Sequence, residues 1–237
     1  MPNDYFQFKQ FIVNQDKCAM KVGTDGVLLG AWASIKNAKK ILDIGTGTGL
    51  IALMLAQRSK AKIIGIEIDK DAANQAKENI LKSPWNDRIE IIQNDFIDFL
   101  KNTHEKFDLI VTNPPYFENA LHSPKNERTI ARHNKQLNFE LLISGVSKIL
   151  NQNGVFSLIL PAELEKKIEN LCFEQDLFRD RICFIKPTHN KNPKRIMMEF
   201  GRKRKMAEKT TLIIEDNERH KYSADYIALT KDFYLKF

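Results

Sequence analysis

Short apolar runs rich in β-branched residues alternate with longer amphipathic stretches from residue 39 onward. Such runs predict five strands, at 40–45, 62–68, 88–93, 107–112 and 155–160. Helical spacing is found in the stretches between them, at 49–59, 70–82, 137–150 and 162–174, with a weaker pattern at 97–102. Strands that alternate with helices in this way indicate βαβ units, and therefore a parallel sheet with helices on both faces.

The pattern changes after residue 176, where three apolar runs follow one another without helices between them. They cover 179–186, 195–201 and 210–215 and predict antiparallel strands at one edge of the sheet. A last helix is expected at 223–232, and the apolar stretch 25–34 predicts a short helix that caps the sheet. We therefore expect one α/β domain with an N-terminal cap (1–38), a core (39–176) and a C-terminal part of strands, basic loop and helix (177–237).

The composition of the 237 residues, with 43% hydrophobic and 28% charged, is typical of a folded globular protein. The first residues show neither a basic start followed by an apolar run nor a membrane span, so we expect a cytosolic protein without a membrane partner. The cysteines are odd in number and widely spaced, so they indicate neither a disulfide framework nor a zinc motif, and we expect no metal. They are Cys18, Cys172 and Cys183.

The net charge of +7 is concentrated in one segment of the chain. Nine Lys or Arg and only two acids lie between Lys186 and Lys209. A localised positive region of this kind is typical of surfaces that neutralise phosphates, although a solvated basic loop would have the same composition.

A glycine-rich turn follows the first predicted strand, in the sequence Asp43-Ile44-Gly45-Thr46-Gly47-Thr48-Gly49. Glycines at this position let the backbone approach a ligand at the carboxyl edge of the sheet, beside the start of a helix. The spacing is G-x-G-x-G. A dinucleotide-binding fingerprint would have its third glycine where this chain has Leu50, so the pattern disfavours a nicotinamide cofactor.

The next two predicted strands each end at an acidic residue. Glu67 can accept both hydroxyls of a ribose, because a carboxylate has two acceptor oxygens. Asp95 can accept the amino hydrogens of an adenine, while Phe96 covers its ring. An acid at a strand end is often only a helix cap, but the three features in this order resemble the S-adenosylmethionine site of class I methyltransferases.

The fourth strand ends in Thr112-Asn113-Pro114-Pro115-Tyr116. A planar amine is a poor nucleophile because its lone pair is delocalised, and two acceptors aimed at its hydrogens draw that pair back. The Asn113 side-chain oxygen and the Pro114 carbonyl can act in this way, on a turn that the prolines stiffen. Tyr116 offers a face on which an extruded base can stack. We assign Asn113 to polarisation and alignment, not to full proton abstraction.

The motif resembles the N-P-P-Y signature of enzymes that methylate adenine N6, guanine N2 or a glutamine amide. Over essentially its whole length the chain also resembles the bacterial tRNA(Val) adenine-N6 methyltransferases. That resemblance is carried by the segments 8–11, 16–32, 83–85 and 229–235. It implies a Rossmann-like class I fold with a seven-stranded, mostly parallel sheet and antiparallel C-terminal edge strands. It also implies methylation of N6 of adenine 37 in the anticodon loop of tRNA1(Val). We expect the enzyme to be a monomer.

The resemblance also assigns residues to the cofactor and to the target base. Residues 113–116 would hold the base, and Asn113 would border the cofactor as well. The segment 21–25 would lie at the methionine end of S-adenosylmethionine. The full expected cofactor set is Lys21, Gly23, Thr24, Asp25, Asp43, Gly45, Gly47, Gly49, Glu67, Asp95, Phe96 and Asn113.

Two polar, basic segments are candidates for contact with RNA. The connection 117–136 directly follows the N-P-P-Y motif, and a connection of this length usually binds something or moves. The region from Lys191 to Lys205 would form a second phosphate-binding wall beside the target base. The expected RNA contacts are Lys125, Arg128, Arg132, Lys191, Lys194, Arg195, Arg202, Lys203, Arg204 and Lys205. His122 and His133 receive no role.

Several other functions share parts of this pattern. A protein glutamine methyltransferase would use Asn113 and Pro114 equally well, but that family has a helical domain before its glycine turn. Methylation of rRNA guanine N2 uses the same motif, and DNA adenine methyltransferases usually need a separate recognition domain. A non-catalytic RNA-binding protein with this fold is the alternative outside catalysis, and the intact set of site residues argues against it.

Overall fold

The structure is a computed structural model, and it describes residues 3–18, 20–115, 138–216, 218 and 220–236. Its centre is an eight-stranded sheet with the strand order β10-β8-β9-β7-β6-β3-β4-β5. The sheet consists of β3 (Lys40–Ile44), β4 (Lys62–Glu67), β5 (Ile89–Gln93), β6 (Phe107–Thr112), β7 (Leu150–Pro161), β8 (Phe178–Lys186), β9 (Arg195–Gly201) and β10 (Glu208–Ile213).

The expected α/β fold with a mostly parallel sheet is confirmed, and two details of the sheet differ. The sheet has eight strands, one more than the resemblance implied. Only β9 is antiparallel, to both β7 and β8, whereas β10 is parallel to β8. The reason is the order of the strands: β9 turns back between β7 and β8, and β10 turns back once more on the far side of β8. β10 therefore has the same direction as β8.

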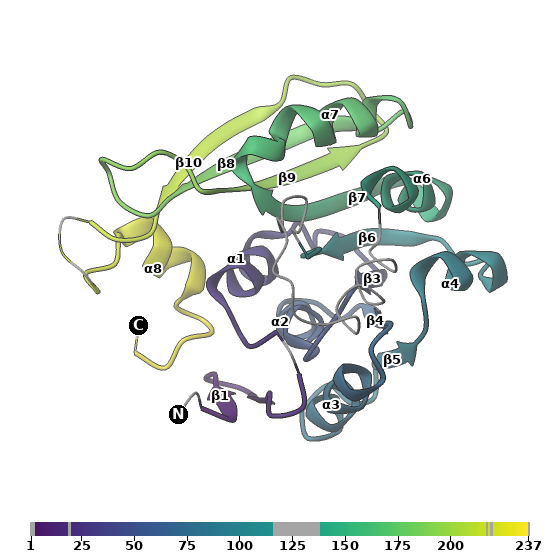
Figure 1. Cartoon of the computed structure of the whole chain (residues 1–237), viewed down its shortest axis with the longest axis horizontal. Helices are drawn as coiled ribbons and strands as arrows, with labels where there is room; N and C mark the ends of the chain where they lie inside the picture. The colour runs from purple at the N-terminus through teal and green to yellow at the C-terminus, as the bar shows by residue number, and fades with distance from the viewer. Residues whose placement is uncertain (1–2, 19, 116–137, 217, 219, 237) are drawn as a thin grey trace, which may run out of the picture.

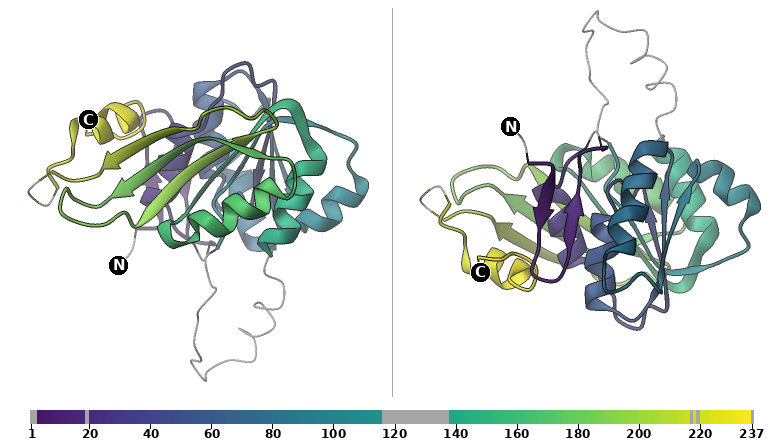
Figure 2. Two further views of the ribbon diagram at one scale, coloured as in Figure 1. Left: turned by 90° about the horizontal axis from the view of Figure 1, so that it is seen from above. Right: turned by 90° about the horizontal axis from the view of Figure 1, so that it is seen from below.

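Helices cover both faces of the sheet (Figures 1 and 2). One face carries α1 (Thr24–Trp32), α2 (Leu50–Arg58), α3 (Lys70–Leu81) and α8 (Ala224–Thr230). The other face carries α4 (Phe96–Asn102), α6 (Phe139–Ile149) and α7 (Glu165–Phe173), which follows the short 3₁₀ helix η1 (Ala162–Leu164). The helices expected from spacing are thus found, within a few residues at their ends. The antiparallel pair β1 (Tyr5–Gln7) and β2 (Ile12–Asn14) was not predicted.

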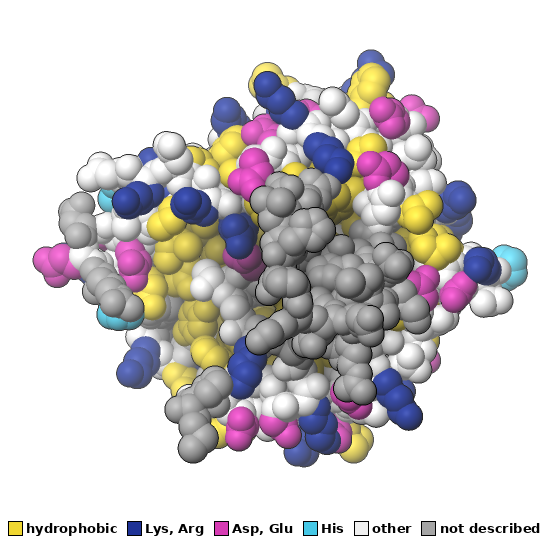
Figure 3. All heavy atoms as spheres, in the orientation of Figure 1, with side chains coloured by type: hydrophobic (Ala, Val, Ile, Leu, Met, Phe, Trp, Pro, Cys, Tyr) yellow, Lys and Arg dark blue, Asp and Glu magenta, His cyan; other side chains and the backbone are white. Residues whose placement is uncertain are grey.

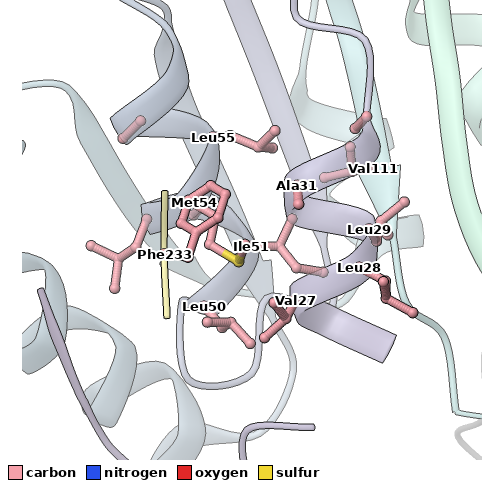
Figure 4. Packing of buried hydrophobic residues seen from close by; sticks show 14 of the residues in the cluster. Val27, Leu28, Leu29, Ala31, Leu50, Ile51, Met54, Leu55, Val111 and Phe233 are labelled. Atoms are coloured by element: carbon pink, nitrogen blue, oxygen red, sulfur yellow. The ribbon is translucent and has the colours of Figure 1, made fainter. Parts of the chain in front are cut away.

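The most extensive contact between two helices among the described residues is between α1 and α2 (Figure 4). Gly30 of α1 allows it, because a Cβ atom at that position would lie 2.7 Å from the Met54 sulfur. One turn earlier, a Cβ atom at Gly26 would lie 3.0 Å from Leu50 Cδ2. The helix expected at 25–34 is therefore packed tightly onto the first turns of α2. This contact places the N-terminal end of α1 beside the glycine-rich turn that precedes α2.

A buried carboxylate in β9 fixes the other end of α1. Glu199 is 2% exposed and accepts hydrogen bonds from the Ser34 backbone amide and hydroxyl, each of 2.8 Å, and from Arg181 Nε at 2.6 Å. Arg181 also donates to the Trp32 carbonyl and lies over the Trp32 ring, 3.7 Å from its centroid. One acid thus joins the end of α1 to β8 and β9.

Replacing Glu199 with alanine should therefore lower the free energy of unfolding by about 2–3 kcal/mol, because the partly buried Arg181 loses its counter-charge. Urea denaturation measures the change. The variant Glu199→Gln keeps an acceptor for Ser34 and should lose about half as much. Equal losses for the two variants would show that the charge of Glu199 accounts for the whole effect and that the acceptor kept in Glu199→Gln contributes nothing.

Candidate functional site

Strand register brings the predicted site residues to one edge of the sheet. Ile44, the last residue of β3, pairs with Ile66 of β4 and with Thr112 of β6. The Thr112 hydroxyl also donates to the Ile44 carbonyl at 2.9 Å. β5 continues this edge, where Glu67 pairs with Gln93. The glycine turn, Glu67, the residues after Gln93 and Asn113 therefore lie at the carboxyl ends of four neighbouring strands.

The glycine-rich turn needs its glycines for their backbone conformation. The φ angles of Gly45, Gly47 and Gly49 are 71°, 55° and 81°, in the left-handed region that strains other residues. A Cβ atom at Gly45 or Gly47 would meet no protein atom within 4 Å, whereas one at Gly49 would lie 3.5 Å from the Ala76 Cβ atom. The first two glycines thus border open space at the strand ends, and the third allows close packing against α3.

Glu67 is held by the backbone of this turn. Its Oε2 atom accepts a hydrogen bond from the Gly47 amide, and its Oε1 atom accepts one from the Asp69 amide, both at 2.9 Å. Each carboxylate oxygen can accept a second hydrogen bond. Glu67 is therefore fixed in orientation and can still accept two hydroxyl donors from a ligand beside the turn.

Asp95 begins α4 as its N-cap. The amides of Ile97 and Asp98 donate to its Oδ1 atom at 2.8 and 3.2 Å, and Oδ2 accepts neither bond. Asp95 therefore has the role of a helix cap, and its Oδ2 atom is left for a ligand. Phe96 is 4% exposed, and its ring lies where a Cβ atom at Gly145 of α6 would contact it, so the residue packs against α6. Its role over an adenine stays a prediction.

Asp43 lies below the glycine turn in the core of the protein. It is fully buried, and its Oδ2 atom accepts a 2.6 Å hydrogen bond from the Thr46 hydroxyl. Burial raises the pKa of this carboxyl to about 7, an effect that the Glu67 charge reinforces and that the bonds from Thr46 and the Ala52 amide oppose. The structure thus places Asp43 as a support of the turn.

This raised pKa predicts a pH dependence of stability. The folded protein holds the Asp43 proton up to about pH 7, while an unfolded Asp loses it near pH 3.8. The free energy of unfolding should therefore fall as the pH rises between these values, by an amount on the order of 4 kcal/mol, and this loss should persist above pH 7. In the variant Asp43→Asn this part of the pH dependence should vanish. Urea denaturation at pH 5 and pH 8 tests it, and an unchanged difference between the two pH values would contradict the assignment.

The residues after β6 differ in exposure. Asn113 is half-buried, Pro114 is buried and Pro115 is exposed. Thr112 pairs with Ile44, the residue directly before the glycine turn. Asn113, which follows Thr112, therefore lies beside that turn. Tyr116, Lys125, Arg128 and Arg132 lie outside the described residues.

The N-terminal site residues surround the start of α1. Gly23 is the N-cap of the helix, Thr24 is exposed, and Lys21 Nζ donates to the Asn3 carbonyl at 3.4 Å. Asp25 forms a 2.7 Å ion pair with Arg195 Nε at the start of β9. Because Arg195 pairs with Pro161 at the end of β7, this ion pair lies at the same edge of the sheet as the glycine turn.

Two buried amide side chains of α3, which sequence reasoning missed, attach the N-terminal segment to the glycine turn. Asn79 Nδ2 donates to the carbonyls of Thr48 and Asn14 at 2.9 Å, and its Oδ1 atom accepts from the Asn14 amide. Gln75 Oε1 accepts from the Lys17 amide at 3.0 Å. The available signal was the presence of two amides four residues apart, on one face of a helix that otherwise buries alanine and isoleucine.

The basic region from Lys191 to Lys205 does not form a single wall, which corrects our expectation. Lys191, Lys194 and Arg195 lie at the carboxyl edge, near the end of β8. β9 then crosses the sheet, and Gly201 pairs with Phe178 at the start of β8. The segment with Arg202, Lys203, Arg204 and Lys205 follows Gly201, so these four residues lie at the opposite end of the sheet. On the face shown in Figure 3, Lys and Arg side chains lie over the ends of β8 and β10 beside exposed apolar side chains.

Other features of the described residues bear on the class of protein. They contain no group of three or more His, Cys, Asp or Glu placed to hold a metal ion. None of their helices combines the length and hydropathy that crossing a bilayer would require. The three cysteines are all buried free thiols, and burial raises the pKa of each.

Comparison with known proteins gives consistent results. A family model described as a methyltransferase domain matches residues 35–211. The tRNA1(Val) (adenine(37)-N6)-methyltransferase of Bacteroides thetaiotaomicron is 48% identical over 237 residues, which cover 99% of each chain. A crystal structure from Agrobacterium tumefaciens, described as a predicted O-methyltransferase, has a TM-score of 0.70 at 22% identity and covers 88% of this chain and 96% of its own. A 16S rRNA methyltransferase of T. thermophilus, solved with AdoMet and guanosine, has a TM-score of 0.57 at 20% identity and covers 84% of this chain and 50% of its own.

Proposed function

The chain belongs to the family of tRNA1(Val) (adenine(37)-N6)-methyltransferases, and from this we propose that it transfers a methyl group from S-adenosylmethionine to N6 of adenine 37 in that tRNA. The observation that carries the proposal is the placement of Asn113 and Pro114 at the strand end beside the glycine turn and Glu67. A nucleoside cofactor and a planar amine would then meet at one edge of the sheet.

The residues at this edge fit S-adenosylmethionine. Gly45 and Gly47 border space that a side chain would fill, and Glu67 offers two acceptor positions to ribose hydroxyls. The Asp95 Oδ2 atom can accept from the adenine amino group. Lys21, Gly23, Thr24 and Asp25 would border the methionine end, which agrees with the contact between Gly26 and the first residue of α2. Asp43 would act indirectly, by supporting the turn.

When bound, the cofactor supplies a methyl group that its positive sulfonium makes reactive. Asn113 and Pro114 align the target amine and polarise it by accepting its hydrogens. They draw the lone pair toward the nitrogen, so that the nitrogen can form the new bond. Pro114 is buried and two prolines follow Asn113, so the acceptors are positioned before the substrate binds. The methylated nitrogen then loses a proton to water. We propose that Tyr116 stacks on the base.

The tRNA would be bound by cations at the same edge. Lys191 and Lys194 are exposed beside the start of β9, and Arg195 is oriented by its ion pair with Asp25. We propose that these residues contact phosphates of the anticodon loop, together with Lys125, Arg128 and Arg132. A loop base can be splayed out at modest energetic cost, which a base within a stem cannot. Since tRNA is the substrate, we expect the enzyme to act in the cytosol, as a single-domain monomer.

Methyl transfer to total RNA from cells that lack the enzyme, followed by nucleoside mass spectrometry, tests the proposal. We expect N6-methyladenosine in the tRNA fraction, and its loss when adenine 37 is replaced in transcribed tRNA1(Val). A product found only as methylglutamine in protein, or as N2-methylguanosine in rRNA, would assign the enzyme to another substrate. Methylation of many tRNAs irrespective of sequence would contradict the specificity for tRNA1(Val).

A further inference from the structure

A cleft lies at the end of the sheet opposite the site. It has a volume of about 300 Å³ and is formed by the end of α7, the start of β8 and the connection between β9 and β10. Phe173, Phe178, Arg179, Arg204 and Lys205 are among the residues that line it. We call this feature, together with the neighbouring Lys203 and Met206, the distal basic cleft.

The cations of the distal basic cleft are held in place by the protein. Arg202 donates to the Ser147 carbonyl before the connection enters the cleft. The Arg204 guanidinium lies 4.6 Å from the centroid of the Phe178 ring and 5.5 Å from that of Phe173. Lys205 Nζ lies 3.1 Å from Asp180 Oδ2. Because the connection is fixed at these points, a ligand that binds the cations has little conformational entropy to remove.

Exposed apolar side chains accompany these cations. Phe173 is 57% exposed and Met206 is 96% exposed. Arg179 pairs with Glu165 and Glu169 through Nη1, and its buried Nε atom has no hydrogen-bond partner. Lys203 is exposed and forms no hydrogen bond or ion pair with the described residues. Cations beside exposed apolar groups form a surface suited to a sugar-phosphate backbone. The phosphates can pair with the cations, and the sugars can lie against the apolar groups.

The distance from the site indicates which part of an RNA could reach this surface. β9 spans the seven residues from Arg195 to Gly201, so its two ends are roughly 20 Å apart. A nucleotide next to the target base cannot cover this distance, whereas a paired region of the same tRNA can. We propose that the distal basic cleft binds the phosphodiester backbone of a paired region of the tRNA whose anticodon loop lies in the site. This inference rests on the proposed function.

The test compares two RNA substrates with the double variant Lys203→Ala/Arg204→Ala. For full-length tRNA1(Val) we expect KM to rise roughly tenfold. We also expect the slope of log affinity against log salt concentration to decrease in magnitude by about 2. For an anticodon loop closed by only two base pairs, which is too short to span the roughly 20 Å between the ends of β9, we expect KM to change less than about twofold, with kcat unchanged for both substrates. The matched control is Lys77→Ala/Lys82→Ala, which removes two exposed charges from α3 and its C-cap and should affect neither substrate.

Three outcomes would overturn the proposal: equal loss on both RNAs, no loss on either, or the same loss in the control variant. No loss on either RNA would assign the cleft to another class of partner. Because Arg204 also packs on two rings, the single variant Lys203→Glu provides a second test that does not depend on that packing, with a KM effect again expected only for full-length tRNA. If the wild-type enzyme methylates neither RNA, the proposed function fails, and direct binding of unmodified tRNA and hairpin by the same variants still tests the cleft.

Discussion

Replacing Asn113 with alanine is expected to lower kcat for methylation of tRNA about a thousandfold. Removing one fixed hydrogen-bond group that acts on the reacting atoms costs other enzymes factors of 10² to 10³. Here the loss should lie at the upper end of that range, because the amine is left with the Pro114 carbonyl as its single acceptor. Single-turnover methylation with saturating enzyme measures the chemical step directly.

The affinity for S-adenosylmethionine should change by less than about threefold in this variant, because Glu67 and the glycine turn remain. Calorimetric titration with the cofactor measures this second quantity. A parallel fall of affinity and rate would show that Asn113 mainly holds the cofactor. Pro115→Ala is the matched control in the same turn. Its side chain is exposed and supplies no acceptor, so it should reduce kcat by about tenfold or less, through loss of stiffness alone.

The sequence predicted those parts of the fold that local physical chemistry determines. The strands from β3 to β7 and the helices between them follow from periodicity, since each buries an apolar face on one sheet. The direction of β10 could not be predicted in this way. An apolar run has the same pattern in a parallel and in an antiparallel pair, and the insertion of β9 between β7 and β8 decides the direction. β1 and β2 are three residues long, too short for an alternation to be recognised.

Residues of the candidate site could be predicted where a residue type has a single physical reason to occur at its position. Gly45 and Gly47 have positive φ angles that other residues adopt at a cost, so their position after a strand was informative. Phe96 shows the opposite case. An aromatic residue at the start of a helix can face a ligand or the core, and the sequence pattern does not show that Phe96 packs against α6. Likewise, charge counting detected the basic segment but not that β9 divides it between the two ends of the sheet.

Replacing Glu67 with alanine is expected to weaken binding of S-adenosylmethionine about a thousandfold. Two hydrogen bonds from ribose hydroxyls to a carboxylate would be lost, at about 1.5–3 kcal/mol each, and a thousandfold change corresponds to about 4 kcal/mol. The Gly47 amide would also lose its acceptor, so the turn would be less well positioned. Calorimetric titration with S-adenosylmethionine gives the affinity, and thermal unfolding without the cofactor shows the effect on folding alone.

Two further variants separate the parts of this effect. Glu67→Gln keeps one acceptor oxygen and loses the charge, so its affinity should fall by roughly tenfold to a hundredfold. Asp71→Ala removes an exposed carboxylate from the first turn of α3, close in sequence but not at the strand end, and should leave the affinity unchanged. If Glu67→Ala lowers the unfolding temperature while its affinity stays within threefold of the wild type, Glu67 only braces the glycine turn. The ribose would then have to be bound elsewhere, and the cofactor placement on which Asn113 depends would be wrong.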